Sequence, residues 1–343
     1  MPRRPPRLTG DETLDDALIA FLDELDPIDR RIALETLGTA LTMARGNVAR
    51  LDRKIVNTAL KEMRQAFSVF APLRSRLKVT LFGSARTAKH DPTYATAREL
   101  AAQMAAKDWM VVTGAGPGIM EAGHEGAGGD HSIGVNIQLP FEAEPNPFIA
   151  ADPKLINFKY FFTRKLIFIK ESDAFVLLPG GFGTMDEAFE LLTLIQTGKS
   201  DLHPIIMLDA PGGSFWRTWE ETFIGMLIKN GMIDHEDRSF FHVTDDVADA
   251  VAQIERFYRV YHSGRYVEGR LVLRLKRVPP RALLERLSEE FADILDGPIE
   301  SVEATEAERR DDDVPDLPRI ALRFDRTHTG RLRALLDRVN DEG

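Results

Sequence analysis

One junction constrains the fold of this chain more than any other segment. An apolar stretch, residues 174–178, runs into a glycine-rich turn and then into an acidic helical stretch, with the sequence Pro179-Gly180-Gly181-Phe182-Gly183-Thr184-Met185-Asp186-Glu187. Glycines between a strand and a helix let backbone N–H groups face a ligand without a Cβ in the way, and a helix N-terminus adds favourable partial charge for an anion. The junction therefore predicts a phosphate site.

Glu187, at the end of this junction, has two interpretations. Thr184-x-x-Glu187 matches a capping box, in which the threonine is the N-cap and the glutamate satisfies a free amide from position N3. In the other interpretation the carboxylate has a chemical task, because a negative charge one turn from a bound phosphate is electrostatically unfavourable. The preceding glycines and a basic pair upstream, Arg164 and Lys165, favour the second interpretation.

From residue 78 onward, strands and helices alternate, which predicts a parallel sheet covered on both faces. The predicted strands are Val79–Phe82, Met110–Thr113, Ile133–Leu139, Ala174–Leu178, Pro204–Leu208 and Phe240–Val243. In the common doubly wound, Rossmann-like order, the first and fourth of these are neighbours, and ligands bind between the loops that leave them. The loops Gly83-Ser84-Ala85-Arg86 and Pro179–Thr184 are therefore expected to meet.

Two different patterns flank this α/β core. Residues 11–74 carry apolar residues at helical spacing, which predicts a helical extension for oligomerisation or a lid, behind a disordered tip at 1–10. Residues 265–343 follow a β-α-β-β-α order, which suggests a small ferredoxin-like α+β appendage for dimerisation or for a regulatory ligand. The catalytic domain is expected at 75–264.

The composition excludes several classes of protein. The chain has 343 residues, a net charge of −10 and no cysteine, which excludes disulfides, thiolate metal sites and cysteine nucleophiles. The acidic balance argues against a general nucleic-acid binder. No apolar run approaches the roughly 20 residues that span a bilayer, and the basic start lacks the apolar segment of a signal peptide. We expect a cytoplasmic protein with neither a nucleic acid nor a membrane as partner.

A second glycine-rich junction, Thr113-Gly114-Ala115-Gly116-Pro117-Gly118-Ile119-Met120-Glu121, follows the second predicted strand. A dinucleotide fingerprint is not matched, because the G-x-G-x-x-G spacing is absent after the first strand and no acidic residue ends the second. A mononucleotide therefore fits this chain better than NAD or FAD, and no cofactor is expected.

The predicted helix at 158–170 is rich in phenylalanine and isoleucine, so it is expected to be largely buried. A guanidinium at Arg164, close to an apolar stripe, needs an anionic partner. That partner is a core carboxylate in a purely structural interpretation, and Glu187 or a bound phosphate in a functional one. A neighbouring cation would keep Glu187 ionised, as a general base requires.

Other titratable residues suggest no further chemistry. The eight histidines form no ligand set, so no metal site is expected. His124 and His131, which flank the second glycine loop, are expected at the surface. Ser84 lacks the G-x-S-x-G context of a serine hydrolase.

The basic pair and the first junction together resemble the LOG family, the cytokinin riboside 5′-monophosphate phosphoribohydrolases that have also been labelled lysine decarboxylases. The family pattern is Arg-Lys followed by P-G-G-x-G-T-x-x-E, and Arg164, Lys165 and residues 179–187 match every fixed position. Gly83-Ser84 and the Thr113–Met120 loop also resemble family elements. The resemblance spans roughly residues 75–262.

The resemblance implies hydrolysis of the N-glycosidic bond of a nucleoside 5′-monophosphate, which releases the base and ribose 5-phosphate. Arg164 and Glu187 would then carry catalysis, and the amides of Gly181, Gly183 and Thr184 would hold the phosphate. The expected substrate site also includes Gly83, Ser84, Gly116, Gly118, Met120, Lys165, Gly180, Phe182, Asp186 and Thr193. Because the family builds its sites near a dimer interface, the resemblance implies a homo-oligomer, a dimer or larger.

Two departures bear on the substrate. Plant-type members have Met-His-x-Arg-Lys, whereas this chain has Phe161-Phe162-Thr163-Arg164-Lys165, and it carries helical and β-α-β-β-α additions that compact members lack. In both respects it is more similar to the larger bacterial nucleotide 5′-monophosphate nucleosidases. AMP is therefore expected alongside a cytokinin-type nucleotide. The acid that protonates the leaving base stays open among Glu121, Glu142 and Asp186.

Three other functions stay open at this point. A non-catalytic nucleotide sensor or carrier on the same fold would bind AMP without turnover, and the intact Arg164 and Glu187 pair weighs against it. A single-stranded DNA binder would need a basic groove with stacking aromatics, which the acidic balance disfavours. A lysine decarboxylase would need a lysine for pyridoxal phosphate, and Lys165 beside Arg164 is a poor candidate.

Overall fold

The structure is a computed structural model that describes residues 11–139, 144–310 and 314–343. The chain divides into two compact units, residues 1–64 and 65–343. The tip predicted to be disordered, residues 1–10, lies outside the described ranges. The domain boundaries predicted near residues 74 and 264 stay predictions.

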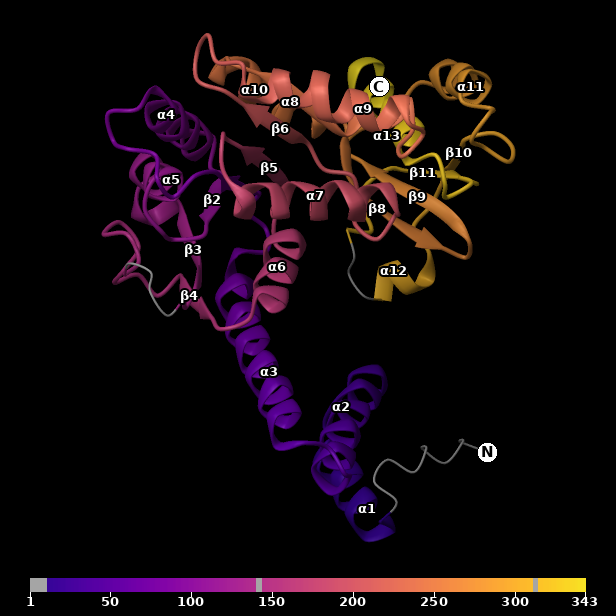
Figure 1. The fold of residues 1–343 in the computed structure, drawn as a ribbon. Helices are drawn as coiled ribbons and strands as arrows, with labels where there is room; N and C mark the ends of the chain where they lie inside the picture. Colours follow the sequence, from indigo (N-terminus) through magenta and orange to yellow (C-terminus); the bar gives the residue numbers. More distant parts are fainter. Residues whose placement is uncertain (1–10, 140–143, 311–313) are drawn as a thin grey trace. The chain divides into compact units, whose positions relative to one another are not determined.

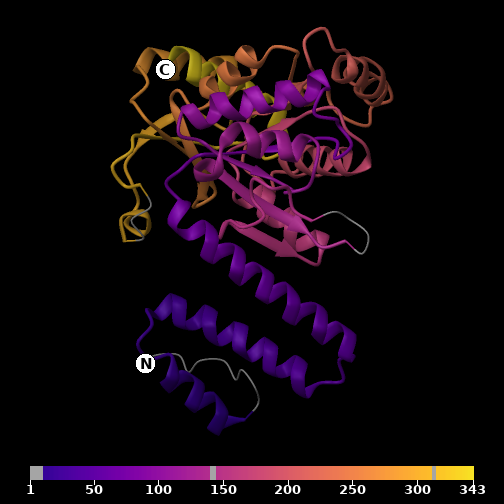
Figure 2. The same ribbon diagram turned by 90° about the vertical axis from the view of Figure 1, so that its left-hand side faces the viewer.

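The first unit is helical. It holds α1 (Glu12–Phe21), α2 (Pro27–Arg45) and most of α3 (Arg50–Phe70), which continues into the second unit (Figure 2). Asp11 caps α1 by accepting a hydrogen bond from the Leu14 amide (3.2 Å), and Asp26 caps α2 by accepting one from the Ile28 amide (2.8 Å). Pro27 occupies the first turn of α2, where its missing N–H costs nothing. The predicted helical extension is therefore confirmed.

The second unit is built on a parallel sheet with the strand order β4-β3-β2-β1-β5-β6-β7 (Figure 1). Its strands are β1 (Lys78–Phe82), β2 (Met110–Thr113), β3 (Ser132–Ile137), β4 (Leu155–Phe158), β5 (Ala174–Leu177), β6 (Ile205–Leu208) and β7 (Phe241–Thr244). β1 pairs with β2 on one side and with β5 on the other. The predicted fold class is confirmed, and so is the switch point between the first predicted strand and the fourth.

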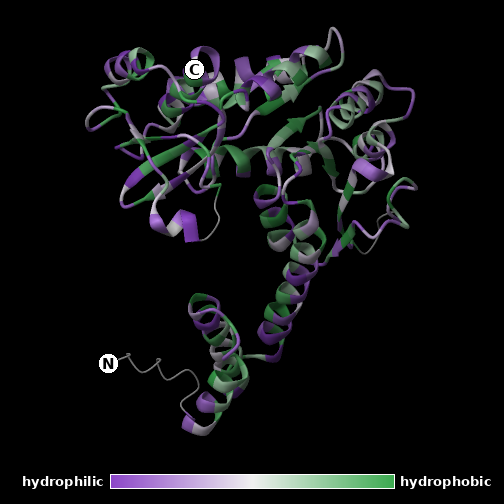
Figure 3. Ribbon diagram, turned by 180° about the vertical axis from the view of Figure 1, so that it is seen from behind, coloured by the Kyte–Doolittle hydropathy of each residue, from purple (hydrophilic) through white to green (hydrophobic). Residues whose placement is uncertain are grey.

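The central strands are mostly apolar and buried along their whole length because helices cover both faces of the sheet. Every residue of β1, β2, β5 and β6 is buried, and these strands appear mostly green in Figure 3. β4 was missed in the sequence, where residue 158 was assigned to a helix. Its burial alternates because it lies at the edge of the sheet, and four residues of such a strand give little periodic signal.

Right-handed crossovers run in opposite directions on the two sides of β1, which places α4 and α5 on one face and α6 and α7 on the other. The helices of this part are α4 (Pro92–Ala106), α5 (Ile119–Ala127), α6 (Phe161–Lys170), α7 (Phe182–Gln196), α8 (Phe215–Trp219), α9 (Gly225–Lys229) and α10 (Val247–Phe257). A π-helical turn, Glu220–Ile224, joins α8 to α9, and 3-10 turns occupy Ala71–Leu73, Gly129–His131 and His235–Phe240.

The C-terminal appendage is a four-stranded antiparallel sheet in the order β10-β11-β9-β8. Its elements are β8 (Tyr261–Val267), β9 (Arg270–Leu275), α11 (Arg281–Glu290), β10 (Glu300–Val302), α12 (Glu306–Arg310), β11 (Arg319–Leu322) and α13 (Thr329–Glu342). β11 lies between β9 and β10, as in a ferredoxin-like split β-α-β. The added strand, β8, was not predicted. It joins β9 through a turn at Glu268 and Gly269, both with positive φ (51° and 84°), and Glu-Gly is not a usual signal for such a turn.

A buried ion cluster lies within this appendage. Glu308 on α12 is about 1% exposed, and its carboxylate binds Arg274 of β9 at 3.0 Å and Arg319 of β11 at 3.4 Å. Burial raises the pKa of Glu308, but hydrogen bonds from the amide and hydroxyl of Thr305 and from Arg274 outweigh burial, and the pKa lies at about 2. This glutamate is therefore ionised throughout the neutral range.

Candidate functional site

Three loops meet at the carboxyl edge of the parallel sheet. The Ser84 amide, after β1, donates to the carbonyl of Pro179 after β5 (3.2 Å), and the Ile119 amide donates to the carbonyl of Ser84 (3.1 Å). Gly118 has a φ of 68°, and a Cβ there would lie 2.4 Å from the Ser84 carbonyl. The two loops predicted to meet therefore do so, and the second glycine loop joins them.

The N-terminus of α7 presents open backbone amides. The helix begins at Phe182 with Gly181 as its N-cap, and the first helical bond runs from the Met185 amide to the Gly181 carbonyl. The amides of Phe182, Gly183 and Thr184 therefore have no partner within the helix. A Cβ at Gly181 or Gly183 would meet nothing within 4 Å. These glycines leave the surface clear for an anion, whereas packing alone would not require them.

The capping-box interpretation of Glu187 is wrong. α7 starts two residues before Thr184, so Glu187 lies in the second turn, beyond the reach of a cap. The side chain of Thr184 packs instead against Gly180, where a Cβ would lie 2.1 Å from its hydroxyl oxygen.

Glu187 is held in a dry environment near two cations. The residue is 7% exposed, and Lys165 and Arg164 act on its carboxylate as nearby charges. Burial raises its pKa to about 7, against a smaller lowering by Lys165 and Arg164. The sequence-based expectation that nearby cations keep Glu187 fully ionised is therefore wrong. At neutral pH the carboxyl group is divided between its acid and base forms.

Lys165 is engaged by acidic residues of α7. Its ammonium lies 2.9 Å from Asp186 and 2.5 Å from Glu190. Burial acts to lower the pKa of Lys165, but hydrogen bonds to these two carboxylates raise it on balance. The lysine therefore ties α6 to α7, and Asp186 is the partner of a cation.

Arg164 extends from α6 toward the second glycine loop. Its Nε donates to the carbonyl of Val135 in β3 (2.9 Å), and its guanidinium lies 5.1 Å from the ring centre of Phe168. A Cβ at Gly114 would lie 2.3 Å from Nη2 of Arg164. Gly114 therefore gives the guanidinium room against the loop backbone, while Arg164 stays within electrostatic range of Glu187.

The prediction that α6 is largely buried is wrong. Phe161, Phe162 and Leu166 are about half exposed, and Phe182 at the start of α7 is 97% exposed. α6 packs on β3 and β4, while its Phe162 and Leu166 line an open cavity of about 950 Å³ that residues of α7 and the appendage also line. In a single chain Phe161, Phe162 and Leu166 therefore stay accessible to solvent.

His124 and Asn146 support the second glycine loop, and neither was predicted to do so. His124 was expected at the surface, yet it is fully buried and contacts Thr113, Ile133 and Asn146. Gly123 and Gly126 beside it were the available signal, because a Cβ at Gly126 would lie 2.0 Å from the Arg98 carbonyl. A helix packed this closely leaves its histidine no route to solvent. His131 is partly exposed.

The remaining predicted residues are placed as follows. Gly83 packs on Ile119, where a Cβ would clash at 2.7 Å, and Met120 packs over Gly116. Thr193 is exposed on α7, and six residues from Glu187 do not return to the same helical face. Of the candidate acids, Glu121 is ion-paired with Lys89 (2.8 Å), and Glu142 lies outside the described residues.

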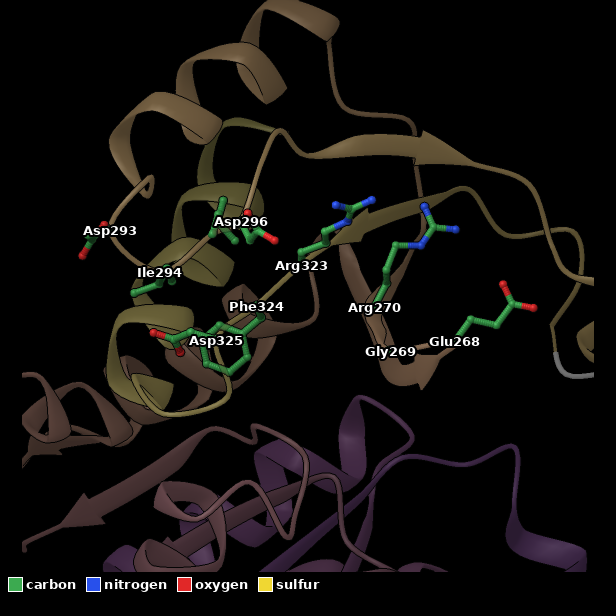
Figure 4. Close-up of a pocket in the computed structure, with 10 residues that line it drawn as sticks. Glu268, Gly269, Arg270, Asp293, Ile294, Asp296, Arg323, Phe324 and Asp325 are labelled. Atoms are coloured by element: carbon green, nitrogen blue, oxygen red, sulfur yellow. The ribbon is translucent and has the colours of Figure 1, made fainter.

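Metal-ligand clusters and membrane-spanning helices are two features that would point to another function. No group of three or more His, Asp or Glu residues is arranged among the described residues to hold a metal ion, and no helix among them is long and apolar enough to cross a membrane. The appendage has an open cavity of about 760 Å³ (Figure 4). Several of its charged groups are already paired: Arg270 with Glu300 (3.3 Å), Asp293 with Arg331 (3.0 Å) and Asp325 with His328 (2.5 Å).

Comparison with known proteins agrees with this arrangement. Residues 118–254 match the family described as "possible lysine decarboxylase". A cytokinin riboside 5′-monophosphate phosphoribohydrolase of Mycobacterium tuberculosis is 33% identical over 47% of this chain and 86% of its own length. Another cytokinin riboside 5′-monophosphate phosphoribohydrolase, from Arabidopsis thaliana, is 26% identical over 61% of this chain and 90% of its own length.

Two further similarities cover other proteins. A pyrimidine/purine nucleotide 5′-monophosphate nucleosidase of Escherichia coli is 26% identical over 48% of this chain and 37% of its own. The structure of the molybdenum cofactor carrier protein of Chlamydomonas reinhardtii is 24% identical over 53% of this chain and 97% of its own, with a TM-score of 0.38. The extent of the mycobacterial match, together with residues 164–165 and 179–187, shows that the chain belongs to the LOG family of cytokinin riboside 5′-monophosphate phosphoribohydrolases.

Proposed function

We propose that this protein hydrolyses the N-glycosidic bond of a nucleoside 5′-monophosphate, with AMP or a cytokinin-type nucleotide as substrate. The observation that carries the proposal is the buried Glu187, with a pKa of about 7, one turn beyond the open amides of α7. The names of the relatives in Mycobacterium tuberculosis and Escherichia coli support the same class of reaction.

The 5′-phosphate binds at the amides of Gly181, Gly183 and Thr184. It is remote from the reacting carbon, so it supplies binding energy and alignment for the step at C1′. Its negative charge is placed at the positive end of α7. The open space over Gly181 and Gly183 supports this position.

Glu187 acts at the ribose. As the C1′–N bond breaks, the ribose passes through an oxocarbenium-like state, which an adjacent carboxylate stabilises electrostatically. Water then adds its oxygen to C1′, the leaving base takes up one proton, and the products are the free base and ribose 5-phosphate. A carboxyl group with a pKa near 7 is suited to accept the proton of that water. Arg164 favours the ionised form of Glu187.

Chromatography of AMP incubated with the protein tests this proposal. Wild type is expected to release adenine and ribose 5-phosphate, and Glu187→Gln to lose roughly 10³-fold or more in kcat. Glu221→Gln, at an exposed glutamate, is the matched control. If AMP is not turned over, CMP, GMP and cytokinin riboside monophosphates follow. Tight binding of these nucleotides without turnover of any of them would favour the sensor or carrier alternative.

We also propose that the protein works as a homo-oligomer, at least a dimer. The support is the exposure of Phe161, Phe162 and Leu166 on α6 and of Phe182 at the start of α7, because exposed large apolar groups are typical of interfaces. Light scattering after size exclusion is expected to give a dimer or larger for wild type and a smaller species for Phe162→Asp. A monomeric wild type would contradict this.

A further inference from the structure

His124 makes its contacts in a fully buried site behind the second glycine loop. Its Nε2 lies 3.1 Å from the carbonyl of Ile133 and 3.1 Å from the hydroxyl of Thr113. Its Nδ1 lies 3.1 Å from the side-chain nitrogen of Asn146. The ring thus spans β3, the end of β2 and the segment that carries Asn146.

These contacts determine the tautomer of the ring. A backbone carbonyl only accepts, so Nε2 of His124 must carry the hydrogen that it donates to Ile133. Nδ1 is then an acceptor, and it faces the donating amide nitrogen of Asn146, whose oxygen lies farther away at 3.4 Å. Burial lowers the pKa of His124 to about 4, so the ring is neutral at physiological pH.

Asn146 transmits this arrangement to the loop. Its side-chain nitrogen lies 3.0 Å from the carbonyls of both Ala115 and Gly116, and its backbone amide donates to Ala115 (2.8 Å). Ala115 has a φ of 62°, in the left-handed region that a residue with a Cβ rarely adopts. An unusual backbone conformation persists only where its surroundings hold it. The two hydrogens of this one amide group are shared among three acceptors, the carbonyls of Ala115 and Gly116 and Nδ1 of His124, so His124 helps to set the orientation in which the amide holds the loop.

The loop in turn forms the wall beside Arg164. Gly114 lies against the guanidinium so closely that a Cβ there would sit 2.3 Å from Nη2. Thr113, which contacts His124, also accepts a hydrogen bond from the Ala115 amide (3.0 Å). A shift of residues 113–116 would therefore move the surface on which Arg164 rests.

We infer that His124, acting through Asn146, is a positioning residue that holds the 113–116 loop and thereby sets the orientation of the Arg164 guanidinium toward the site. The kinetic consequence of this inference rests on the proposed function, but the structural consequence does not. Neither residue needs to touch the substrate.

The test uses variants that separate hydrogen bonding from packing. His124→Phe keeps a ring and removes both hydrogen bonds, and Asn146→Leu removes the donors at similar size. His124→Asn can still accept from Asn146, although the smaller side chain leaves a cavity. His131→Phe, on the partly exposed histidine nearby, is the matched control.

The first measurement is the NMR signal of the Arg164 Nε–H, assigned by its absence in Arg164→Lys. In wild type this group donates to Val135 and should exchange slowly with water. We expect its exchange to accelerate in His124→Phe and Asn146→Leu, and to stay close to wild type in His124→Asn and His131→Phe. An unchanged signal in both His124→Phe and Asn146→Leu would overturn the inference, whatever the enzyme does.

The second measurement is the kinetics of AMP hydrolysis. A displaced catalytic group lowers kcat by about 10- to 100-fold, while KM should change less than about threefold because the phosphate is held at α7. His124→Asn should recover most of kcat even where it is less stable to heat than His124→Phe. If kcat instead follows thermal stability across the series, His124 has only a structural role. No turnover by wild type would count against the proposed function, and the Arg164 signal would still decide the inference.

Discussion

Two glutamates in this protein are buried beside pairs of cations, and their pKa values are shifted in opposite directions from the ordinary value. Glu308 in the appendage has a pKa of about 2, and Glu187 at the sheet edge has one of about 7. Both lose hydration, which alone would raise the pKa. For Glu308, direct hydrogen bonds from Arg274 and Thr305 replace the lost hydration of the carboxylate. Arg164 and Lys165 act on Glu187 only across space, so burial prevails there.

The difference shows why a carboxylate near cations is not necessarily a stable ion. The cations near Glu187 are bound elsewhere: Arg164 donates to Val135, and Lys165 is paired with Asp186 and Glu190. The carboxylate of Glu308 has hydrogen-bond partners and stabilises the appendage. Glu187 has a pKa near neutral pH, and shifted pKa values of this kind are common at functional sites.

The largest expected effect is the loss of the Glu308 cluster. Glu308→Gln leaves Arg274 and Arg319 without their buried carboxylate, which should lower the free energy of unfolding by about 3–5 kcal/mol. The folded pKa is depressed, so this stabilisation is present above pH 4.5 and is lost as pH falls toward 2. Urea unfolding followed by tryptophan fluorescence reports it, because Trp109, Trp216 and Trp219 all lie in the second unit. The exposed Glu306→Gln is the control, and equal stability of the two variants would refute the prediction.

Glu187→Gln should change the free energy of unfolding in the opposite direction, by raising it. The folded pKa of about 7 exceeds the ordinary 4.5, so wild type loses stability as pH rises from 4.5 through 7. The amide avoids that loss, and the variant should gain roughly 3 kcal/mol at pH 8 and almost nothing at pH 4.5. The same urea titration at both pH values checks this, with Glu221→Gln as control. A destabilised Glu187→Gln at pH 8 would show that the carboxylate is better solvated than its burial implies.

Arg164→Gln should alter the chemistry of Glu187 more than the fold. Removing a positive charge that lowers the pKa of Glu187 should move the acidic inflection of the kcat/KM profile to higher pH. Activity should fall by about 100-fold, the usual cost of losing one electrostatic group at such a site. Initial rates of AMP hydrolysis across pH measure both effects. Arg217→Gln, at an exposed arginine of α8, should leave the profile unchanged, and an unshifted profile in Arg164→Gln would contradict the coupling.

The smallest effect concerns the glycines before Glu187. Gly183→Ala places a methyl group over open amides, so KM for AMP should rise about tenfold with stability preserved or slightly improved. Gly180→Ala should instead lower stability, because its Cβ would lie 2.1 Å from the Thr184 hydroxyl oxygen. Kinetics and thermal melting of the two variants separate phosphate binding from packing. Similar behaviour of both variants would argue against a phosphate at Gly183.

Much of the fold and part of the site could be predicted from local sequence. The glycine junction after residue 178 and the alternation of strands and helices identified the α/β core and the two loops that meet, because backbone conformation and burial on both faces leave local marks. β4 and β8 were missed for a related reason. One is a short edge strand, and the other turns at Glu268-Gly269, which carries no common turn signal.

The roles of single side chains were harder to predict. α6 looks like a buried helix in the sequence, yet its phenylalanines are half exposed, because composition does not say which face a helix turns to the sheet. His124 was placed at the surface although it supports the loop beside Arg164. Contacts between residues distant in sequence, such as His124 and Asn146, leave no periodic pattern.

The sequence by itself determined the α/β core, the anion-suited start of α7 and membership of the LOG family, since each depends on residues that are neighbours along the chain. Only the tertiary structure decided that Glu187 is not a cap and that its pKa lies near 7 rather than below 4.5. It also decided that the pKa of Glu308, which is buried as well, is lowered instead. The physical reason is that hydration and hydrogen bonding at a carboxylate depend on everything packed around it, and several elements of the fold supply those neighbours.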